Sequence, residues 1–176
     1  ADGLYDEQFT IPEISGAGAV NTITFTSASG DSSKVILEYS GMKSANNYLI
    51  QLDGADHITF EKLTLRASNA DYQRLLVLGN AANNNSFRNM DFSGDSVAVS
   101  SSLRALVISD GSVNDTGNVF QNNLFTEGSY AFYLLGTGST TPAGSVTLQN
   151  NVFREQYAAA IYMKHFGAVL ISGNKM

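Results

Sequence analysis

A short phrase of alternating apolar residues returns five times in the last two-thirds of the chain. Its copies span residues 58–65, 86–92, 119–125, 147–153 and 170–176. The first apolar anchor of each copy follows the previous one after 27, 33, 28 and 23 residues, counted from Phe60, Phe87, Phe120, Leu148 and Ile171. A repeat of this length is one supersecondary unit, and such a unit buries its apolar face only by stacking on its neighbours. The sequence therefore predicts a solenoid.

A second apolar segment precedes each copy of the phrase, at residues 49–52, 75–78, 105–108, 132–135 and 160–163. Gly or Asp follows each segment within a few residues, which is typical of turns. Short alternating runs rich in β-branched and aromatic residues are typical of strands. Each repeat therefore predicts three short strands, one at the leading segment and one on each side of the midpoint of the phrase.

The midpoint of the phrase predicts a sharp bend rather than a hairpin. The midpoint residues are Leu63, Met90, Asn123, Asn151 and Asn174. Asn tolerates the left-handed helical region better than most residues, so an inward Asn suits a tight change of direction between two strands. Each strand then pairs with its own copy one coil above and below, about 4.8 Å away.

This pattern resembles the right-handed parallel β-helix of the pectin-lyase-like group, and the resemblance covers residues 48–176. It implies an all-β solenoid of about five to seven coils with three short strands each. The right-handed sense of the winding is implied by the resemblance. In that group stacked Asn side chains form a ladder at the tight turn. Asn123, Asn151 and Asn174 lie where the ladder would run, whereas Leu63 and Met90 depart from it and predict apolar packing at the first two corners.

Two other folds compete with this prediction. A leucine-rich repeat is the rival solenoid, but its short period and its Leu-x-x-Leu-x-Leu pattern are absent. Helix propensity alone would make residues 157–164 a helix. Because this segment keeps the register of the repeat, we expect a strand.

The chain divides into an N-terminal part at residues 1–47, which predicts opening coils or a cap, and the coils at residues 48–176. The Thr- and Ser-rich N-terminal part resembles the opening coils of large surface proteins from gliding, polysaccharide-degrading bacteria. The chain starts at Ala1 without a Met and stops at Met176, inside a copy of the phrase. We therefore expect a fragment of a longer secreted or cell-surface protein, truncated at its C-terminal end, with a signal peptide removed upstream.

Composition excludes several classes of function. The chain has no Cys, which excludes a disulfide scaffold, a thiol nucleophile and a thiolate metal site. The net charge is −6 and no basic run is present, which argues against nucleic acid as a partner. No stretch approaches the roughly 20 apolar residues of a membrane span.

In catalytic members of the pectin-lyase-like group, the substrate lies along the outer face of the first strand of each coil. Alternation predicts that the outward column reads Gln51, Val77, Val107, Leu134 and Tyr162. This column offers neither the several oxygen ligands that Ca²⁺ needs nor the carboxylate pair of a glycosidase. The sequence thus predicts no cofactor and no metal site, although it leaves Ca²⁺ binding open.

The remaining candidate groups lie in turns. Asp53 and Asp56 are interpreted as turn formers. A role in acid–base catalysis would require a carboxylate or a substrate proton near His57 or His165, and both residues are interpreted as solvated turn residues.

The loops that follow the third strands are richer in polar and aromatic side chains. Tyr beside Arg, Glu and Gln suits contact with carbohydrate, because ring faces pack on sugar C–H groups while forked donors and acceptors bind hydroxyls. The alternative is that these charges only keep the edge soluble. The candidate contact residues are Arg66, Tyr72, Arg74, Glu127, Tyr130, Arg154, Tyr157, Tyr162 and Lys164.

Three functions remain open. The favoured one is a non-catalytic β-helix segment of a secreted or cell-surface bacterial protein, acting as an adhesin, a stalk or a glycan-contacting module. The second is a polysaccharide lyase or glycoside hydrolase of the pectin-lyase-like group whose site is incomplete in this fragment, with Arg66, Arg74, Arg154 and Lys164 as candidate bases. The third is a purely structural stack. Its apolar outer column would be covered by long loops such as 94–103, or by a neighbouring domain or subunit.

Overall fold

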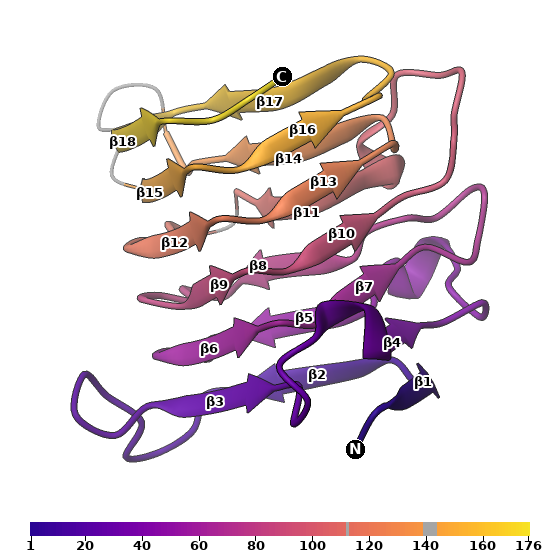
Figure 1. Cartoon of the computed structure of the whole chain (residues 1–176). Coiled ribbons are helices and arrows are strands. Elements are labelled where there is room, and N and C mark those ends of the chain that lie inside the picture. The colour runs from indigo at the N-terminus through magenta and orange to yellow at the C-terminus, as the bar shows by residue number, and fades with distance from the viewer. Residues whose placement is uncertain (112, 139–143) are drawn as a thin grey trace.

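The computed structural model describes residues 1–111, 113–138 and 144–176, and it shows an all-β, right-handed parallel β-helix of about six coils (Figure 1). Its strands form three parallel sheets of six strands each. Each coil passes through one strand of every sheet, and each strand pairs with its counterparts in the neighbouring coils. The solenoid and the three strands per coil predicted from the sequence are confirmed.

Within each repeat the chain passes through the three sheets in the order B, C, A. Sheet B carries the leading strand of each coil: β2 (Phe9–Pro12), β5 (Ile50–Asp53), β8 (Leu76–Gly79), β11 (Ala105–Asp110), β14 (Tyr130–Leu135) and β17 (Ala159–Lys164). Sheet C follows: β3 (Ile23–Thr26), β6 (Ile58–Glu61), β9 (Ser86–Arg88), β12 (Asn118–Gln121), β15 (Gly144–Gln149) and β18 (Phe166–Ser172). Sheet A closes the coil: β1 (Gly3–Asp6), β4 (Val35–Glu38), β7 (Thr64–Arg66), β10 (Asp91–Ser93), β13 (Leu124–Thr126) and β16 (Val152–Arg154).

Two uncertain segments can now be placed. Residues 159–164 form the strand β17 and not a helix, because they pair in parallel with β14. Residues 1–47 contain β1 to β4, and these strands pair in the same three sheets as the later coils. Short 3-10 helices stand in three of the connections: η1 (Ser32–Lys34), η2 (Ser44–Asn46) and η3 (Ser102–Arg104).

The core consists of columns of identical or similar side chains along the axis of the helix. Parallel pairing in register places equivalent residues one strand spacing apart, about 4.8 Å. In sheet C the rings of Phe60, Phe87 and Phe120 stack with centroid distances of 5.8 and 4.5 Å. In sheet A, Phe92 and Phe125 stack at 4.6 Å, and Phe125 and Phe153 at 5.3 Å. Buried aromatic rings therefore hold two of the three walls together.

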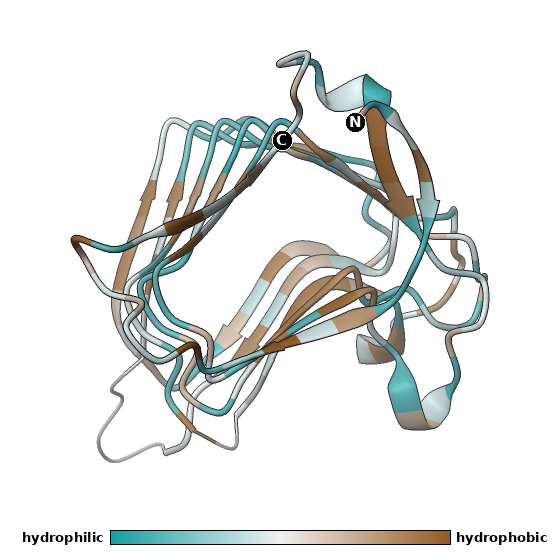
Figure 2. Cartoon of the chain, turned by 90° about the horizontal axis from the view of Figure 1, so that it is seen from below, coloured by the Kyte–Doolittle hydropathy of each residue, from teal (hydrophilic) through white to brown (hydrophobic). Residues whose placement is uncertain are grey.

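The turns from sheet C to sheet A, which we name the C–A corner, carry the predicted Asn ladder. The Oδ1 atom of Asn151 accepts from the backbone N and the Nδ2 of Asn123, at 2.9 and 3.1 Å. Asn174 accepts in the same way from Asn151, and Asn123 accepts from the backbone N of Met90. Seen along the axis, these turns lie over one another (Figure 2). Leu63 and Met90 are buried, as expected of apolar packing at the first two of these corners.

The bend itself is made by a different residue from the one predicted. The left-handed conformation belongs to the residue before each midpoint: Lys62, Asn89, Asn122, Asn150 and Gly173, with φ between 52° and 65°. The inward Asn is needed for its side chain, which bonds backbone groups of the corner and of the adjoining coil. The sequence analysis assigned both the left-handed conformation and the inward side chain to one residue. In the structure, one residue adopts the left-handed conformation and the next supplies the inward side chain.

A second set of buried Asn residues stabilises the turns from sheet B to sheet C, the B–C corner. Asn85 Oδ1 accepts from Ile58 N and Asn118 Oδ1 accepts from Asn85 N, both at 2.9 Å. Their Nδ2 groups donate to the carbonyls of Ala55 and Ala82. Both side chains are almost completely buried. Because buried polar backbone groups need partners, these two residues do at this corner what the ladder does at the other.

Candidate functional site

The outward column of sheet B differs from the predicted one in two coils. Its register partners are Gln51, Val77, Ile108, Tyr133 and Tyr162, a set that we name the outer strip. The predicted members Val107 and Leu134 point into the core and are at most 1% exposed. In β11 and β14 apolar residues occupy both faces, so alternation along the chain does not reveal which face is inside. A shift of one residue exchanges the two faces.

Two tyrosines at the upper end of the outer strip, Tyr133 and Tyr162, form a cluster with Tyr130, which we name the tyrosine cluster. The rings of Tyr133 and Tyr162 stack with their centroids 4.6 Å apart and their planes 12° from parallel. Tyr130 meets them edge-on, at 5.2 Å from Tyr133 and 6.0 Å from Tyr162. The Tyr162 side is open to solvent, with 39% of the residue exposed. The cluster is a rigid aromatic surface with hydroxyl groups at its rim.

The strands and one loop position this cluster. Tyr133 and Tyr162 are direct partners in the pairing of β14 with β17, so the strand spacing itself brings their rings into contact. Tyr130 is held by a hydrogen bond of 2.6 Å between its hydroxyl and that of Ser100. Ser100 belongs to the long loop 94–101, which reaches the tyrosine cluster from the side. This loop thus contacts the tyrosine cluster through Ser100.

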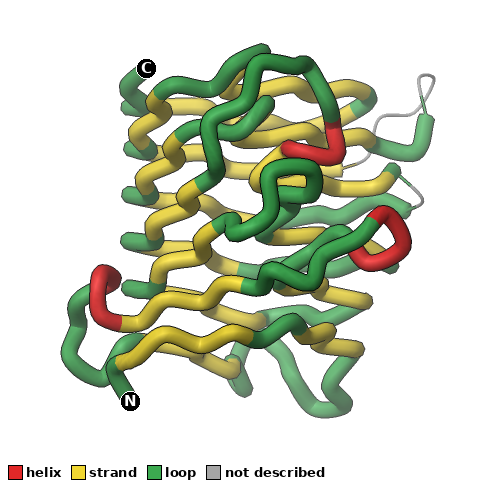
Figure 3. The backbone as a smooth tube through the Cα atoms, turned by 90° about the vertical axis from the view of Figure 1, so that its right-hand side faces the viewer, coloured by secondary structure: helices red, strands yellow, loops and turns green. Residues whose placement is uncertain are grey.

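The connections from sheet A to sheet B, the A–B corner, carry most of the other predicted contact residues (Figure 3). Tyr72 and Arg74 lie in the loop 67–75. Tyr72 lines a shallow hollow of about 200 Å³ together with Asp71, Val99, Ser101, Leu103 and Arg104, which we name the corner hollow. The Nε atom of Arg74 donates to the carbonyl of Ser102 at 3.1 Å. Tyr72 is therefore available at a surface hollow, whereas Arg74 fixes one loop to the next.

In the upper coils the same corner gathers three more of the predicted residues. The backbone N of Glu127 donates to the carbonyl of Arg154 at 2.8 Å. The backbone N of Tyr157 donates to the carbonyl of Gly128 at 3.0 Å, and Tyr157 is 55% exposed. The side chain of Gln156 donates to three backbone carbonyls and closes the turn. Glu127, Arg154 and Tyr157 thus lie at one corner, as the stacking of the repeats predicted.

Two predicted residues lie apart from this corner group. Arg66 ends β7 on sheet A, where it forms an ion pair with Glu38 at 2.7 Å. Lys164 ends β17 at the opposite edge of sheet B, two residues beyond Tyr162, and its backbone carbonyl accepts from Gly136. The predicted set is therefore a corner group and a strand-face group, with Arg66 on a different wall.

The turn residues considered as catalytic candidates take part in the backbone structure of their turns. His57 and His165 both have left-handed backbone conformations, with φ of 58° and 63°. Asp56 accepts from the backbone N of Asn83 across one coil. Among the residues that the structure describes, no group of three or more His, Cys, Asp or Glu side chains gathers in one place. Within the same residues, no helix is long and apolar enough to cross a membrane.

One carboxyl outside these groups is perturbed. Asp91 starts β10 on the outer face of sheet A, where the hydroxyl of Ser32 donates to it at 3.4 Å from the turn 27–34. Partial burial raises the pKa of Asp91 above its ordinary value, and the hydrogen bond from Ser32 opposes the rise. This turn is the one described C–A connection that is long and irregular, and it lies over sheet A near β4 and β7 (Figure 1).

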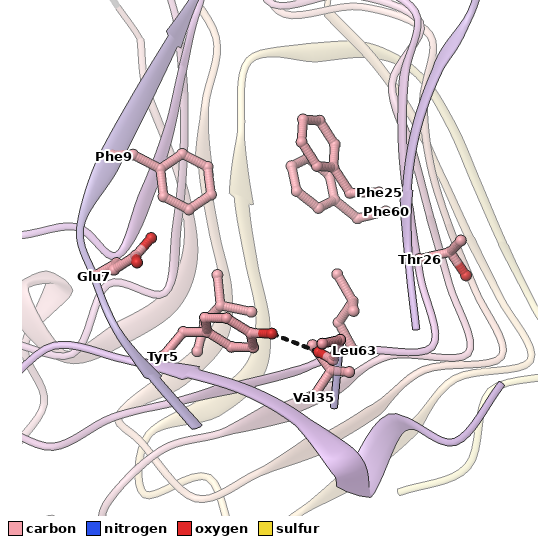
Figure 4. Close-up of a pocket in the computed structure, with 10 residues that line it drawn as sticks. Tyr5, Glu7, Phe9, Phe25, Thr26, Val35, Phe60 and Leu63 are labelled. Atoms are coloured by element: carbon pink, nitrogen blue, oxygen red, sulfur yellow. Dashed lines mark hydrogen bonds between the residues drawn. The ribbon is translucent and has the colours of Figure 1, made fainter. Parts of the chain in front are cut away.

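A hollow of about 270 Å³ at the N-terminal end of the stack lacks the features of a binding site. It is lined by core side chains of the first coils, among them Phe9, Phe25 and Phe60 (Figure 4). Apolar side chains dominate its wall, and Tyr5 donates its hydroxyl proton to the carbonyl of Ala1 beside it. The hollow lies at the axial end of the core, against the first strands of the sheets.

Several residues of these surfaces were not predicted from the sequence: Tyr133 and Ser100, and all the lining residues of the corner hollow except Tyr72. Tyr133 was overlooked because the outward column was displaced by one residue in its strand. Arg104 and Ser100 were overlooked because the loop before β11 has no counterpart of similar length in the next two coils. The spacing of 29 residues between Tyr133 and Tyr162 was a usable signal for Tyr133, since 29 lies within the range of the repeat.

Comparison of the chain with known proteins identifies no relative. No protein-family model matches the sequence, no curated protein matches it, and no solved structure matches the fold.

Proposed function

We propose that this chain is a non-catalytic β-helix module of a secreted or cell-surface bacterial protein, in the manner of the pectin-lyase-like group, and that it contacts glycans. The observation that carries the proposal is the tyrosine cluster. Tyr162 stacks on Tyr133 with one ring face on a rigid strand pair and is 39% exposed, and Tyr130 is fixed against them. Aromatic faces pack on the C–H faces of sugars, and hydroxyls at the rim offer donors and acceptors.

The chemistry of the outer strip supports contact rather than catalysis. Its members from the lower to the upper coils are an amide, two aliphatic side chains and two tyrosines, without a carboxylate. Hydrolysis of a glycosidic bond ordinarily uses two carboxyl groups on either side of the bond. A strand-borne aromatic surface is preorganised, so little conformational entropy is lost when a ligand binds.

The test is a polysaccharide panel, with and without Ca²⁺, scored for retained protein and for soluble products by mass spectrometry. We expect retention on at least one glycan without product. Tyr162→Ala should weaken retention by tenfold or more, which corresponds to about 1.4 kcal/mol. Tyr48→Ala is the matched control, because it removes a partly exposed tyrosine of the A–B corner that belongs neither to the cluster nor to the candidate contact residues.

Two outcomes would contradict the proposal. Equal retention of wild type and Tyr162→Ala would show that the cluster is not the contact surface. Release of product from any glycan would instead favour the alternative function, a polysaccharide lyase or glycoside hydrolase, and would direct attention to Arg154 and Lys164 as candidate bases.

A further inference from the structure

The corner hollow lies beside the tyrosine cluster but is built by other elements. Its walls come from the loop 67–75 and from the segment 99–104, which ends in η3. Val99 and Leu103 supply exposed aliphatic surface, at 41% and 39% exposure, and Tyr72 supplies an aromatic wall. At about 200 Å³ the hollow is smaller than the roughly 300–1,000 Å³ of an ordinary small-molecule pocket. It has room for one ring rather than for a chain.

Hydrogen bonds fix the loop 67–75 at this corner. Asn69 Oδ1 accepts from the backbone N of Asp71 and of Tyr72, while its Nδ2 donates to the carbonyls of Ser40 and Met42. Gln73 is fully buried and bonds Ala70 and Asp95 with its side chain. The wall that carries Asp71 and Tyr72 is therefore preorganised before any ligand arrives.

The opposite wall is held equally well. The carbonyl of Leu103 accepts from Asn47 Nδ2 at 2.8 Å and from the backbone N of Gln73 at 3.1 Å. The hydroxyl of Ser101 accepts from the backbone N of Leu103, and the backbone N of Ser101 donates to the hydroxyl of Ser129. The two walls are thus joined to each other and to neighbouring coils by hydrogen bonds that do not involve the mouth of the hollow.

An ion pair stands among the lining groups. Arg104 Nη2 contacts Asp71 Oδ1 at 2.6 Å, with 72% of the Asp71 side chain and 21% of the Arg104 side chain exposed. The Nε atom of Arg104 is buried and makes no hydrogen bond to any described residue. An exposed pair contributes little to stability, whereas a buried donor without a partner is destabilising. Stability therefore gives little reason for Arg104 at this position.

We propose that the corner hollow binds a single neutral sugar residue that carries adjacent hydroxyl groups. The exposed carboxylate of Asp71 accepts a hydrogen bond from one hydroxyl, and the guanidinium of Arg104 donates to its neighbour. Tyr72 and Leu103 pack against the C–H face of the ring. An anionic sugar is disfavoured, because Asp71 would repel it and the chain as a whole carries a net charge of −6.

This inference rests on the proposed function and extends it, because the hollow and the tyrosine cluster share one loop. Ser100 bonds Tyr130, and the residues on either side of it, Val99 and Ser101, line the hollow. A glycan lying on the cluster can therefore place a branch or terminal residue in the hollow. Two weak contacts on one ligand bind more tightly than either alone.

The experiment is methyl NMR of the whole chain, with the methyl groups of Val99 and Leu103 as reporters. The probes are the methyl glycosides of galactose, mannose and fucose, with galacturonate as the charged comparison. Titration to about 100 mM detects dissociation constants in the millimolar range. We expect at least one neutral glycoside to shift both reporters, and Asp71→Asn to weaken that binding by tenfold or more.

Two control variants test whether the binding is specific to the corner hollow. Glu38→Gln removes the ion pair with Arg66, which has similar geometry on sheet A, and it should leave the titration unchanged. Tyr162→Ala should also leave the shifts of the two reporters unchanged, since Tyr162 does not line the hollow. Loss of polymer retention in Tyr162→Ala together with intact reporter shifts would therefore support both sites.

Three results would overturn the inference: no reporter shift with any neutral probe, equal affinity in Asp71→Asn, or tighter binding of galacturonate than of the neutral glycosides. None of these results depends on the tyrosine cluster, so failure of the hollow is distinguishable from failure of the proposed function. Asp71 is largely exposed, and its change to Asn keeps the shape of the side chain, so the variant should fold.

Discussion

The chain turns from one sheet to the next in different ways at the C–A and A–B corners of the coil. At the C–A corner four successive coils turn in two residues each, at 62–63, 89–90, 122–123 and 150–151. At the A–B corner the connections differ in length, from the nine residues of 67–75 and the eleven of 94–104 to the three of 127–129. The regular corner holds the stack together through repeated buried hydrogen bonds. The irregular corner carries the exposed Tyr157, the ion pair of Asp71 with Arg104, and the corner hollow.

The difference shows where a solenoid can carry chemistry. Each coil of the regular corner must match its neighbours, because the Oδ1 of one Asn accepts a hydrogen bond from the backbone N of the preceding coil. A loop at the irregular corner leaves the stack, so its length and composition are free to vary. Disruption should therefore act on global stability at the first corner and on local order or binding at the second.

The largest expected effect is that of Asn151→Ala in the middle of the ladder. The substitution removes the acceptor of Asn123 N and Nδ2 and the donor to the carbonyl of Phe120, all of them buried. Because each buried group left without a partner costs about 1–3 kcal/mol, we expect a loss of about 3 kcal/mol of unfolding free energy. Urea denaturation measures it. Gln149→Ala, on the outer face of β15, is the control and should change stability by less than about 0.5 kcal/mol.

A smaller effect is expected from Asn69→Ala at the irregular corner. Asn69 makes four hydrogen bonds within and below the loop 67–75, but its surroundings are partly exposed and water can replace some of its partners. We expect the free energy of local opening of this loop to fall by about 1–2 kcal/mol, so that amide exchange becomes faster within the loop only. Hydrogen exchange followed by mass spectrometry measures this change. Protection lost in β10 and β13 as well would mean that the two corners are not independent.

The smallest effect, and one of opposite sign, is expected from Asp91→Asn, where the irregular turn 27–34 lies over the start of β10. Burial raises the pKa of Asp91 in the folded chain, so the carboxyl contributes stability in acid that is lost as the pH rises through the folded pKa. Asn carries no charge and loses nothing over this range. The variant should therefore be more stable than wild type at neutral pH, by less than either loss above.

The pH dependence decides whether burial of Asp91 is the cause. The advantage of Asp91→Asn should shrink as the pH falls through the folded pKa and vanish below 3.8, the ordinary value for the carboxyl. Thermal unfolding at several pH values measures this. An advantage that persists unchanged in strong acid would point to packing, and a loss at neutral pH would show that the hydrogen bond from Ser32 outweighs burial.

Much of the fold could be predicted from the sequence, because a repeat specifies the same contacts many times. Phe60, Phe87 and Phe120 recur in step, and their stacking follows once strands pair in register. Asn123, Asn151 and Asn174 at one point of the phrase predicted the ladder that the structure shows. The strand at residues 159–164 followed from the same register against its local helix propensity, because pairing with β14 outweighs the preference of a short segment.

The face of a strand and the contents of the irregular corner were decided by tertiary structure alone. In β11 and β14 both faces are apolar, so Val107 and Ile108 cannot be told apart until the pairing partner is known. The contact of Arg104 with Asp71 joins residues 33 positions apart, a step within the range of the repeat, in equivalent connections of nine and eleven residues. Because the two connections differ in length and composition, the spacing alone does not predict that these two side chains meet. The repeat specifies the same stacking contacts in every coil, so the sequence determines the stack. The candidate site occurs once, and its geometry depends on the tertiary positions of individual loops.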